Sequence, residues 1–165
     1  MKNITDIYNI IEKENIILEE VKFKQSNIEG IYFKVPEISP TIGINIKLIS
    51  DTKKYISVLA EELGHHFTSI GNLTAESITY RDKLNLSKQE MRARRWAANY
   101  LISDDEITVA ILQNISTLYG LSSHFNVTEE IIKYKLLSIY LNEDKYNSTR
   151  LTIMNKEVAY GCCDL

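Results

Sequence analysis

Cysteine is scarce in this chain of 165 residues, and the two that occur, Cys162 and Cys163, are adjacent and near the end. They do not form the disulfide framework of a small secreted protein, and a bond between neighbouring cysteines is strained. No apolar run approaches the roughly 18–20 residues of a membrane-spanning helix. The N-terminal residues include Asp6 and lack the apolar segment of a secretory signal. We therefore expect a cytoplasmic protein that does not bind a membrane.

An excess of positive charge is missing as well, since the formal net charge is −3. The composition therefore gives no general attraction to nucleic acid or to an anionic membrane. Hydrophobic residues make up 44% and charged residues 25%, values that are ordinary for a globular chain. The sequence has no internal repeat and no low-complexity tract. The length predicts one domain, or one domain with a helical extension, large enough to bury a core.

The N-terminal part mixes helical and strand patterns. Apolar residues at helical spacing predict a helix over residues 4–12. Runs of β-branched and aromatic residues at 16–23, 30–33 and 42–46 predict three short strands in a small antiparallel sheet.

From Asp51, a suitable N-cap, the chain is mostly helical. Ser87 with Glu90, and Ser103 with Glu106, have the spacing of a capping box. A polar loop is expected at about 71–85, and the last twenty or so residues show no clear period. The predicted helices of this part span about 52–68, 87–102, 103–112, 116–124 and 129–141.

The most informative run lies inside the 52–68 helix and reads Glu61-Glu62-Leu63-Gly64-His65-His66. A zinc peptidase helix needs two ligands four residues apart, so that both leave one face of the helix. It also needs a glutamate directly after the first ligand, to take a proton from metal-bound water. Glu61, Glu62 and His65 have this spacing, with Glu61 where such a helix has histidine. Gly64 costs about 1 kcal/mol in a helix interior and indicates that something, such as a strand or a substrate, packs close to the backbone.

Plainer interpretations of the same residues stand beside this one. An amphipathic helix can carry two glutamates and two histidines on its polar side without forming a site. Glu62 and His66 are also four residues apart and would bind a metal without an adjacent base. Glu90 can complete a capping box with Ser87 or form a salt bridge with Arg94 at the ordinary i, i+4 spacing.

With these residues in view, the chain resembles the ImmA/IrrE family of metallopeptidases, which is found on phages and other mobile elements. The family pattern is His-Glu-Leu-Gly-His, followed on a second helix by Glu-x-x-Ala-Asn-x-Phe-Ala. The second run here reads Glu90-Met91-Arg92-Ala93-Arg94-Arg95-Trp96-Ala97. A phage-associated branch reads Ala-Glu-Glu-Leu-Gly-His-His and Arg-Ala-Arg-x-Trp-Ala, as residues 60–66 and 92–97 do. The resemblance includes the order of elements over about 4–140.

This resemblance implies that Glu61, His65 and Glu90 bind a catalytic Zn²⁺ and that Glu62 is the general base. Three protein ligands leave the fourth position of a catalytic zinc open. The extra carboxylate of Glu61 makes bound water less acidic and the site more accepting of manganese or another divalent metal.

The implied function is that of a hydrolase, a zinc-dependent metalloendopeptidase that cleaves a transcriptional repressor of the same phage or mobile element. The alternative is a catalytically silent metal-binding module that binds a repressor or regulator without cutting it. We expect an α+β fold with a small antiparallel sheet, a zincin-like metal site between two helices and a helical C-terminal part. The expected divisions are a metallopeptidase-like core over 1–112, a helix-turn-helix-like extension over 113–145 and a C-terminal tail over 146–165.

The 116–141 helix pair invites comparison with a DNA-reading helix-turn-helix. Glu129 and Glu130 open its second helix, where they would repel phosphate. The arginine cluster within 92–95 is confined to about one turn beside Trp96, which is typical of a solvated surface next to a core tryptophan. We therefore expect no direct DNA binding. The pair is expected to pack on the core or to bind a protein partner.

Overall fold

A computed structural model of the chain describes residues 2–25, 27–69 and 80–161, with the backbone alone for 80–82 and 156–161. The strands are β1 (Ile17–Val21), β2 (Gly30–Phe33) and β3 (Thr41–Asn45), and β3 leads into a 3₁₀ helix, η1 (Ile46–Leu48). The α-helices are α1 (Ile4–Lys13), α2 (Thr52–Thr68), α3 (Tyr80–Leu101), α4 (Asp104–Leu112), α5 (Leu118–His124), α6 (Glu129–Tyr140) and α7 (Glu143–Gly161). The predicted α+β class is confirmed. None of these helices is long and apolar enough to cross a membrane.

The sheet is mixed, so the prediction of an antiparallel sheet is wrong for one of its two strand pairs. The strand order is β1-β3-β2, with β2 antiparallel and β1 parallel to β3. The chain reverses direction after β1 and again after β2, so β1 and β3 run the same way. β3 then enters between the two earlier strands. The residue pattern sets which segments become strands, whereas the order in which they pair is decided by packing against the helices.

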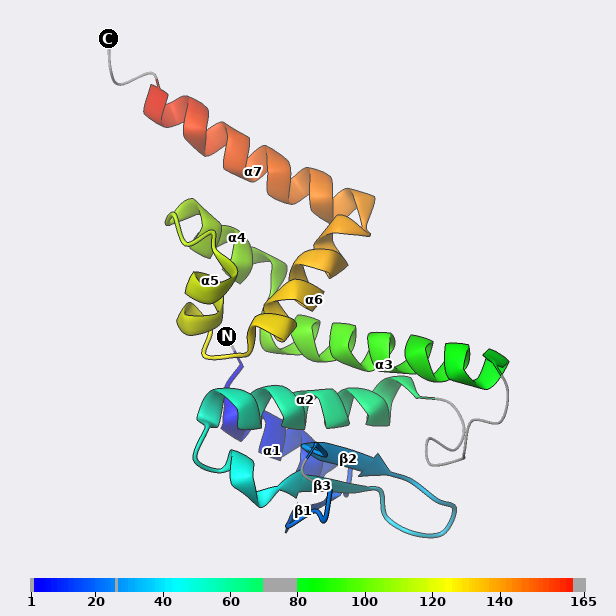
Figure 1. The fold of residues 1–165 in the computed structure, drawn as a ribbon. Coiled ribbons are helices and arrows are strands. Elements are labelled where there is room, and N and C mark those ends of the chain that lie inside the picture. Colours follow the sequence, from blue (N-terminus) through cyan, green and yellow to red (C-terminus); the bar gives the residue numbers. More distant parts are fainter. Residues whose placement is uncertain (1, 26, 70–79, 162–165) are drawn as a thin grey trace.

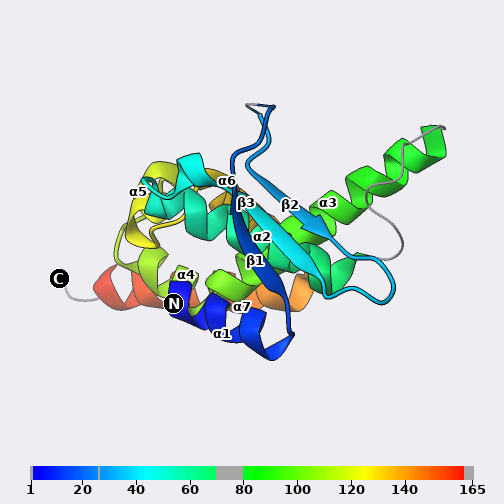
Figure 2. The ribbon, with the colours of Figure 1, turned by 90° about the horizontal axis from the view of Figure 1, so that it is seen from below.

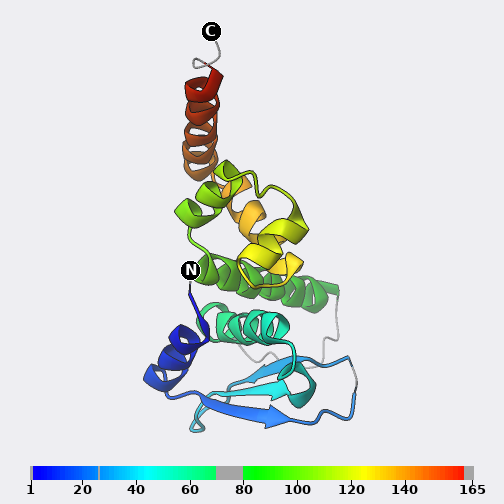
Figure 3. The same ribbon diagram turned by 90° about the vertical axis from the view of Figure 1, so that its left-hand side faces the viewer.

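Helix α2 lies at the centre of the molecule, with the sheet on one side and α3 on the other (Figure 1, Figure 3). Seen from below, the sheet crosses α2 (Figure 2). Because it is covered on two sides, α2 buries more than one stripe of its surface, with nine buried residues between Tyr55 and His65. Its bounds match the prediction. The predicted N-cap is confirmed too, because the Asp51 side chain accepts a hydrogen bond from the backbone N of Lys54 at 3.0 Å.

Helix α3 begins earlier than expected. Residues 71–79 of the predicted 71–85 loop lie outside the described residues, but the helix already includes Tyr80. Ser87 is therefore inside the helix and is not an N-cap, so the capping-box interpretation of Glu90 is wrong. The first turns of α3 extend past the end of α2 (Figure 1), and residues there such as Leu84 are exposed. A helical turn that buries little shows no apolar period in the sequence.

Helices α4, α5 and α6 follow the prediction closely. The expected capping box of α4 is present, with Glu106 N donating to Ser103 Oγ and Ser103 N donating to Glu106 Oε2. At the start of α6 the chain is fastened to α2, because Thr128 N donates to Ser57 Oγ at 2.9 Å. The expectation that this helix pair packs on the core is confirmed. The described apolar core runs from Ile7 to Ile139 and so continues past the predicted boundary at residue 112; the division into 1–112 and 113–145 stays a prediction.

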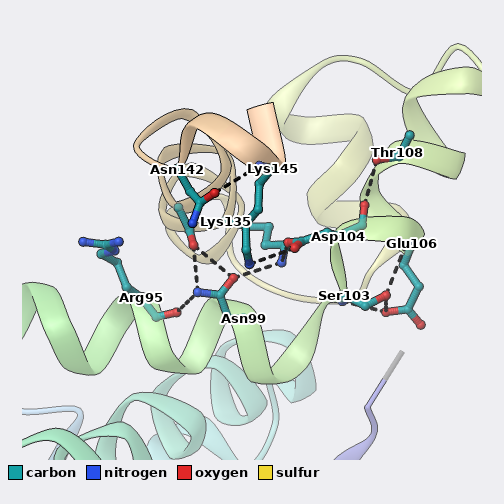
Figure 4. A network of polar contacts seen from close by, with 10 residues as sticks. Arg95, Asn99, Ser103, Asp104, Glu106, Thr108, Lys135, Asn142 and Lys145 are labelled. Atoms are coloured by element: carbon teal, nitrogen blue, oxygen red, sulfur yellow. Dashed lines mark hydrogen bonds and ion pairs between the residues drawn. The ribbon is translucent and has the colours of Figure 1, made fainter. Parts of the chain in front are cut away.

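Helix α7 covers much of residues 146–165, for which the sequence predicts a C-terminal tail. None of residues 143–155 is buried, so the part of this helix whose side chains are described packs no apolar face that a sequence pattern could reveal. Its first turns are fastened by polar contacts around Lys135, whose side chain is only 1% exposed (Figure 4). Lys135 Nζ lies 2.6 Å from Asp104 Oδ1, and Lys145 Nζ of α7 lies 2.8 Å from Asp104 Oδ2. Cys162 and Cys163 lie outside the described residues.

Candidate metal centre

A cavity of about 620 Å³ lies where β2, α2, α3 and the first turn of α6 meet. The residues that the sequence singled out, Glu61, Glu62, His65 and Glu90, all line it. Three of them come from consecutive turns of α2 and the fourth from α3, two helices that lie side by side in Figure 1. The structure therefore brings the predicted metal ligands and the predicted base into one cavity between two helices.

The imidazole of His65 is oriented toward Glu90 across this cavity. Its Nδ1 lies 3.1 Å from Ser69 Oγ, and its Nε2 lies 3.4 Å from Glu90 Oε1. Two ligands of one tetrahedral zinc, each bonded at about 2.0–2.1 Å, lie roughly 3.3–3.4 Å apart. A hydrogen-bond partner on the second ring nitrogen is also the usual way in which a metal-binding histidine is oriented. His65 and Glu90 thus have the separation and the orientation that two ligands of one ion need.

Gly64 explains how Glu90 comes so close to His65. A Cβ placed on Gly64 would lie 2.4 Å from the carbonyl oxygen of Ala93, which is closer than real Cβ contacts. Only glycine lets the backbones of α2 and α3 approach this closely. The prediction of a close neighbour at Gly64 is confirmed, but the neighbour is the backbone of α3, neither a strand nor a substrate. Glu90 lies about one turn of α3 before Ala93, and Trp96 lies about one turn after it.

Glu62 is a partly buried carboxyl group that faces β2. A Cβ placed on Gly30 would lie 2.5 Å from Glu62 Oε1, so Gly30 leaves the space that this side chain occupies. Burial raises the pKa of Glu62 to about 7; the His65 charge opposes this rise and Glu61 adds to it. A carboxyl group with a pKa near 7 is suited to accept and return protons at neutral pH. The sequence did not single out Gly30, because nothing in the pattern pairs β2 with this turn of α2.

Glu61 has a cationic neighbour, Arg94, that the sequence pattern does not pair with it. Arg94 Nε lies 3.6 Å from Glu61 Oε2, and Arg94 Nη2 lies 3.9 Å from Glu90 Oε2. Burial raises the pKa of Glu61 to about 7 even though the Arg94 charge lowers it. The predicted i, i+4 pair of Glu90 and Arg94 is confirmed, and Glu90 contacts His65 as well. Arg94 also contacts Glu130 of α6 at 2.8 Å, a partner 36 residues away that no spacing rule reveals.

His66 points elsewhere. Its Nδ1 lies 3.0 Å from the Tyr32 hydroxyl and its Nε2 lies 3.6 Å from Glu14 Oε2. His66 does not line the cavity, which argues against the alternative metal pair of Glu62 and His66.

The arginine cluster within 92–95 is only partly the solvated surface that the sequence predicts. Arg94 turns toward the cavity carboxylates, and Arg92 is exposed. Trp96 is partly buried against the core. Its ring stacks between those of Phe67 and Tyr100, with distances between ring centroids of 4.8 Å and 5.1 Å.

The donor set has the chemistry of a divalent-metal site, with one imidazole and two carboxylates. Two of the three donors already lie at the spacing of ligands to one ion, whereas Glu61 is turned toward Arg94. Among the described residues, no three His, Cys, Asp or Glu side chains are clustered closely enough to hold an ion as they stand. The donor types therefore fit a divalent metal, whereas Glu61, as it lies beside Arg94, does not complete the cluster. The assignment of Glu61, His65 and Glu90 as ligands stays a prediction.

Comparison with known protein families agrees with these observations. The family model Peptidase_M78, described as the IrrE N-terminal-like domain, matches residues 11–137. The matched segment begins in α1 and ends in α6, so it includes every residue that lines the cavity. No curated protein and no solved structure matches the chain.

Proposed function

Because the chain belongs to the Peptidase_M78 family, through its IrrE N-terminal-like domain, we propose that it is a metal-dependent endopeptidase. In this proposal Glu61, His65 and Glu90 bind one divalent metal ion, and Glu62 is the general base. Family membership alone makes the function metallopeptidase-like. The observation that carries the residue assignment is the 3.4 Å separation of His65 Nε2 and Glu90 Oε1 in the cavity that Glu62 also lines.

Each side chain has a defined task in the proposed reaction. A divalent ion in such a site supplies an activated water and polarises the carbonyl of the scissile bond. Glu62 accepts a proton from the attacking water and returns it to the leaving amine, for which a pKa near neutrality is suited. Ser69 keeps the His65 ring oriented through its Nδ1. Gly30 leaves room for the Glu62 carboxylate.

The position of β2 supports a peptide as the substrate. In the described sheet β2 pairs only with β3, so its other edge is open. Three of its residues, 30–32, line the cavity. An extended peptide that pairs with an exposed strand edge gains backbone hydrogen bonds whatever its side chains are. A polypeptide segment bound along β2 would therefore pass directly beside Glu62.

We propose a transcriptional repressor of the same phage or mobile element as this substrate, cleaved in the cytoplasm. The support is the resemblance of residues 60–66 and 92–97 to the phage-associated branch of the family. Zinc is the proposed ion. Manganese is the second candidate, because two carboxylates and one imidazole make a harder donor set than two imidazoles and one carboxylate.

Cleavage and its loss on metal removal test the proposed function. The purified chain, supplied with zinc or manganese, is incubated with the repressor encoded beside it, and the products are followed by gel electrophoresis and mass spectrometry. We expect one or a few defined cuts, their disappearance after a chelator is added, and their return when the metal is restored. Binding of the repressor without any cut under both metals would favour the silent module over the peptidase.

A further inference from the structure

The guanidinium group of Arg94 stands between the candidate metal ligands and helix α6. On the cavity side it has only long contacts, at 3.6 Å to Glu61 and 3.9 Å to Glu90. On the α6 side its Nη1 donates a hydrogen bond to Glu130 at 2.8 Å and lies 3.4 Å from the Tyr134 hydroxyl. The group also lies over the Tyr134 ring, 5.8 Å from its centroid.

These contacts show which side holds the arginine. A 2.8 Å hydrogen bond anchors Arg94 on Glu130, with a longer one to Tyr134, whereas the approach to Glu61 is too long for a hydrogen bond. The Nε atom of Arg94, which faces Glu61, is buried and has no hydrogen-bond partner. An unsatisfied buried donor is costly, so this atom is the least stabilised part of the side chain. Arg94 is therefore held by α6, and its Nε, which has no hydrogen-bond partner, faces Glu61.

The charges at positions 61 and 94 differ from those of the family pattern, and the two differences cancel. Compared with the family pattern, Glu61 stands where the first ligand is histidine, so the ligand set carries one extra negative charge. Arg94 stands where the second-helix pattern has asparagine, so it adds one positive charge. The two positions whose charge differs from the pattern contact each other across the cavity. Together they leave the net charge of the site as it would be with histidine and asparagine.

We propose that Arg94 is the counter-charge to Glu61 and sets the metal affinity of the site. This inference rests on the proposed metal site. The guanidinium holds Glu61 away from the other two donors and repels an incoming cation, so metal binding has to displace the contact between Arg94 and Glu61. The anchor on Glu130 gives the guanidinium a position to keep when Glu61 turns toward the ion. Arg94 is a positioning residue that acts through Glu61, not a ligand.

The test is the zinc dissociation constant of the full-length chain, measured by competition with a chromophoric chelator. Arg94→Gln should bind zinc roughly tenfold more tightly or better, because a positive charge within a few ångströms of the ligands is removed. Arg95→Gln is the matched control. It changes the net charge equally from the next position of α3, but Arg95 does not line the cavity, so the affinity should change by less than about threefold. A merely structural role for Arg94 would weaken zinc binding, not strengthen it.

A second comparison separates the pair from a general charge effect. In a Glu61→Ala background, the gain from Arg94→Gln should shrink by at least about threefold, because no carboxylate remains to be released. Arg94→Asn carries the same test if Arg94→Gln fails to fold, which circular dichroism reports. If the wild type binds zinc and both Arg94 variants bind it equally or more weakly, the role of Arg94 is overturned and the proposed function stands. Absence of zinc binding in every variant would overturn both.

Discussion

Glu62→Gln is expected to lower the cleavage rate by about 10²- to 10⁴-fold, the range typical of a lost general base. Glutamine matches glutamate in shape and fills the space beside Gly30 in the same way. It cannot accept a proton from water, however, and it removes the group whose pKa burial raises to about 7. Metal binding should persist, because Glu62 is not among the proposed ligands.

The measurement is a single-turnover cleavage assay with metal content determined on the same samples. Glu29→Gln is the matched control, since Glu29 lines the same cavity and forms an ion pair with Lys54. We expect this control to cleave within a few-fold of the wild type. Equal cleavage by the wild type and Glu62→Gln would remove Glu62 from the role of base. Loss of metal in Glu62→Gln would instead make it a ligand.

His65→Ala is expected to abolish metal binding, and His66→Ala largely to spare it. His65 directs its Nε2 toward Glu90 at 3.4 Å, and among the described residues it is the only histidine that lines the cavity. His66 contacts Tyr32 and Glu14, and its own side chain does not line the cavity. The two substitutions are chemically identical and one position apart, so each is the control for the other.

Isothermal titration with zinc, after the protein has been freed of metal, decides between the two histidines. The reverse outcome, binding lost in His66→Ala and kept in His65→Ala, would favour the alternative pair of Glu62 and His66. Thermal unfolding of both variants without metal shows whether either loss reflects damage to the fold.

Much of the fold follows from local sequence signals. The side chains of Asp51 and Ser103 cap α2 and α4 as their spacing predicts, because a cap is made within one turn of its own helix. The positions of the strands also follow from the pattern of β-branched residues. Features without a local signal were missed. The parallel pairing of β1 with β3 depends on tertiary packing, and α7 and the first turns of α3 bury too little to show a period.

The same distinction applies to the candidate site. That Glu61 and His65 share one face of α2 is a property of helix geometry, and the sequence predicts it. The meeting of His65 with Glu90 could be anticipated only through the family resemblance, because it depends on the close approach of two helices at Gly64. The contact of Arg94 with Glu130 joins residues 36 positions apart. It has no sequence signal, and the sequence pattern alone predicts for Glu130 only that it repels phosphate.

The most direct test of the central claim is the position of the metal itself, measured by anomalous diffraction at the zinc edge from crystals of the zinc-loaded chain. The account predicts one anomalous peak per chain in the cavity between α2 and α3. This peak should lie within about 2.0–2.2 Å of His65 Nε2 and of one carboxylate oxygen each from Glu61 and Glu90, with Glu62 uncoordinated beside it. A peak bound by Glu62 and His66, or zinc-loaded crystals with no peak in this cavity, would contradict the account.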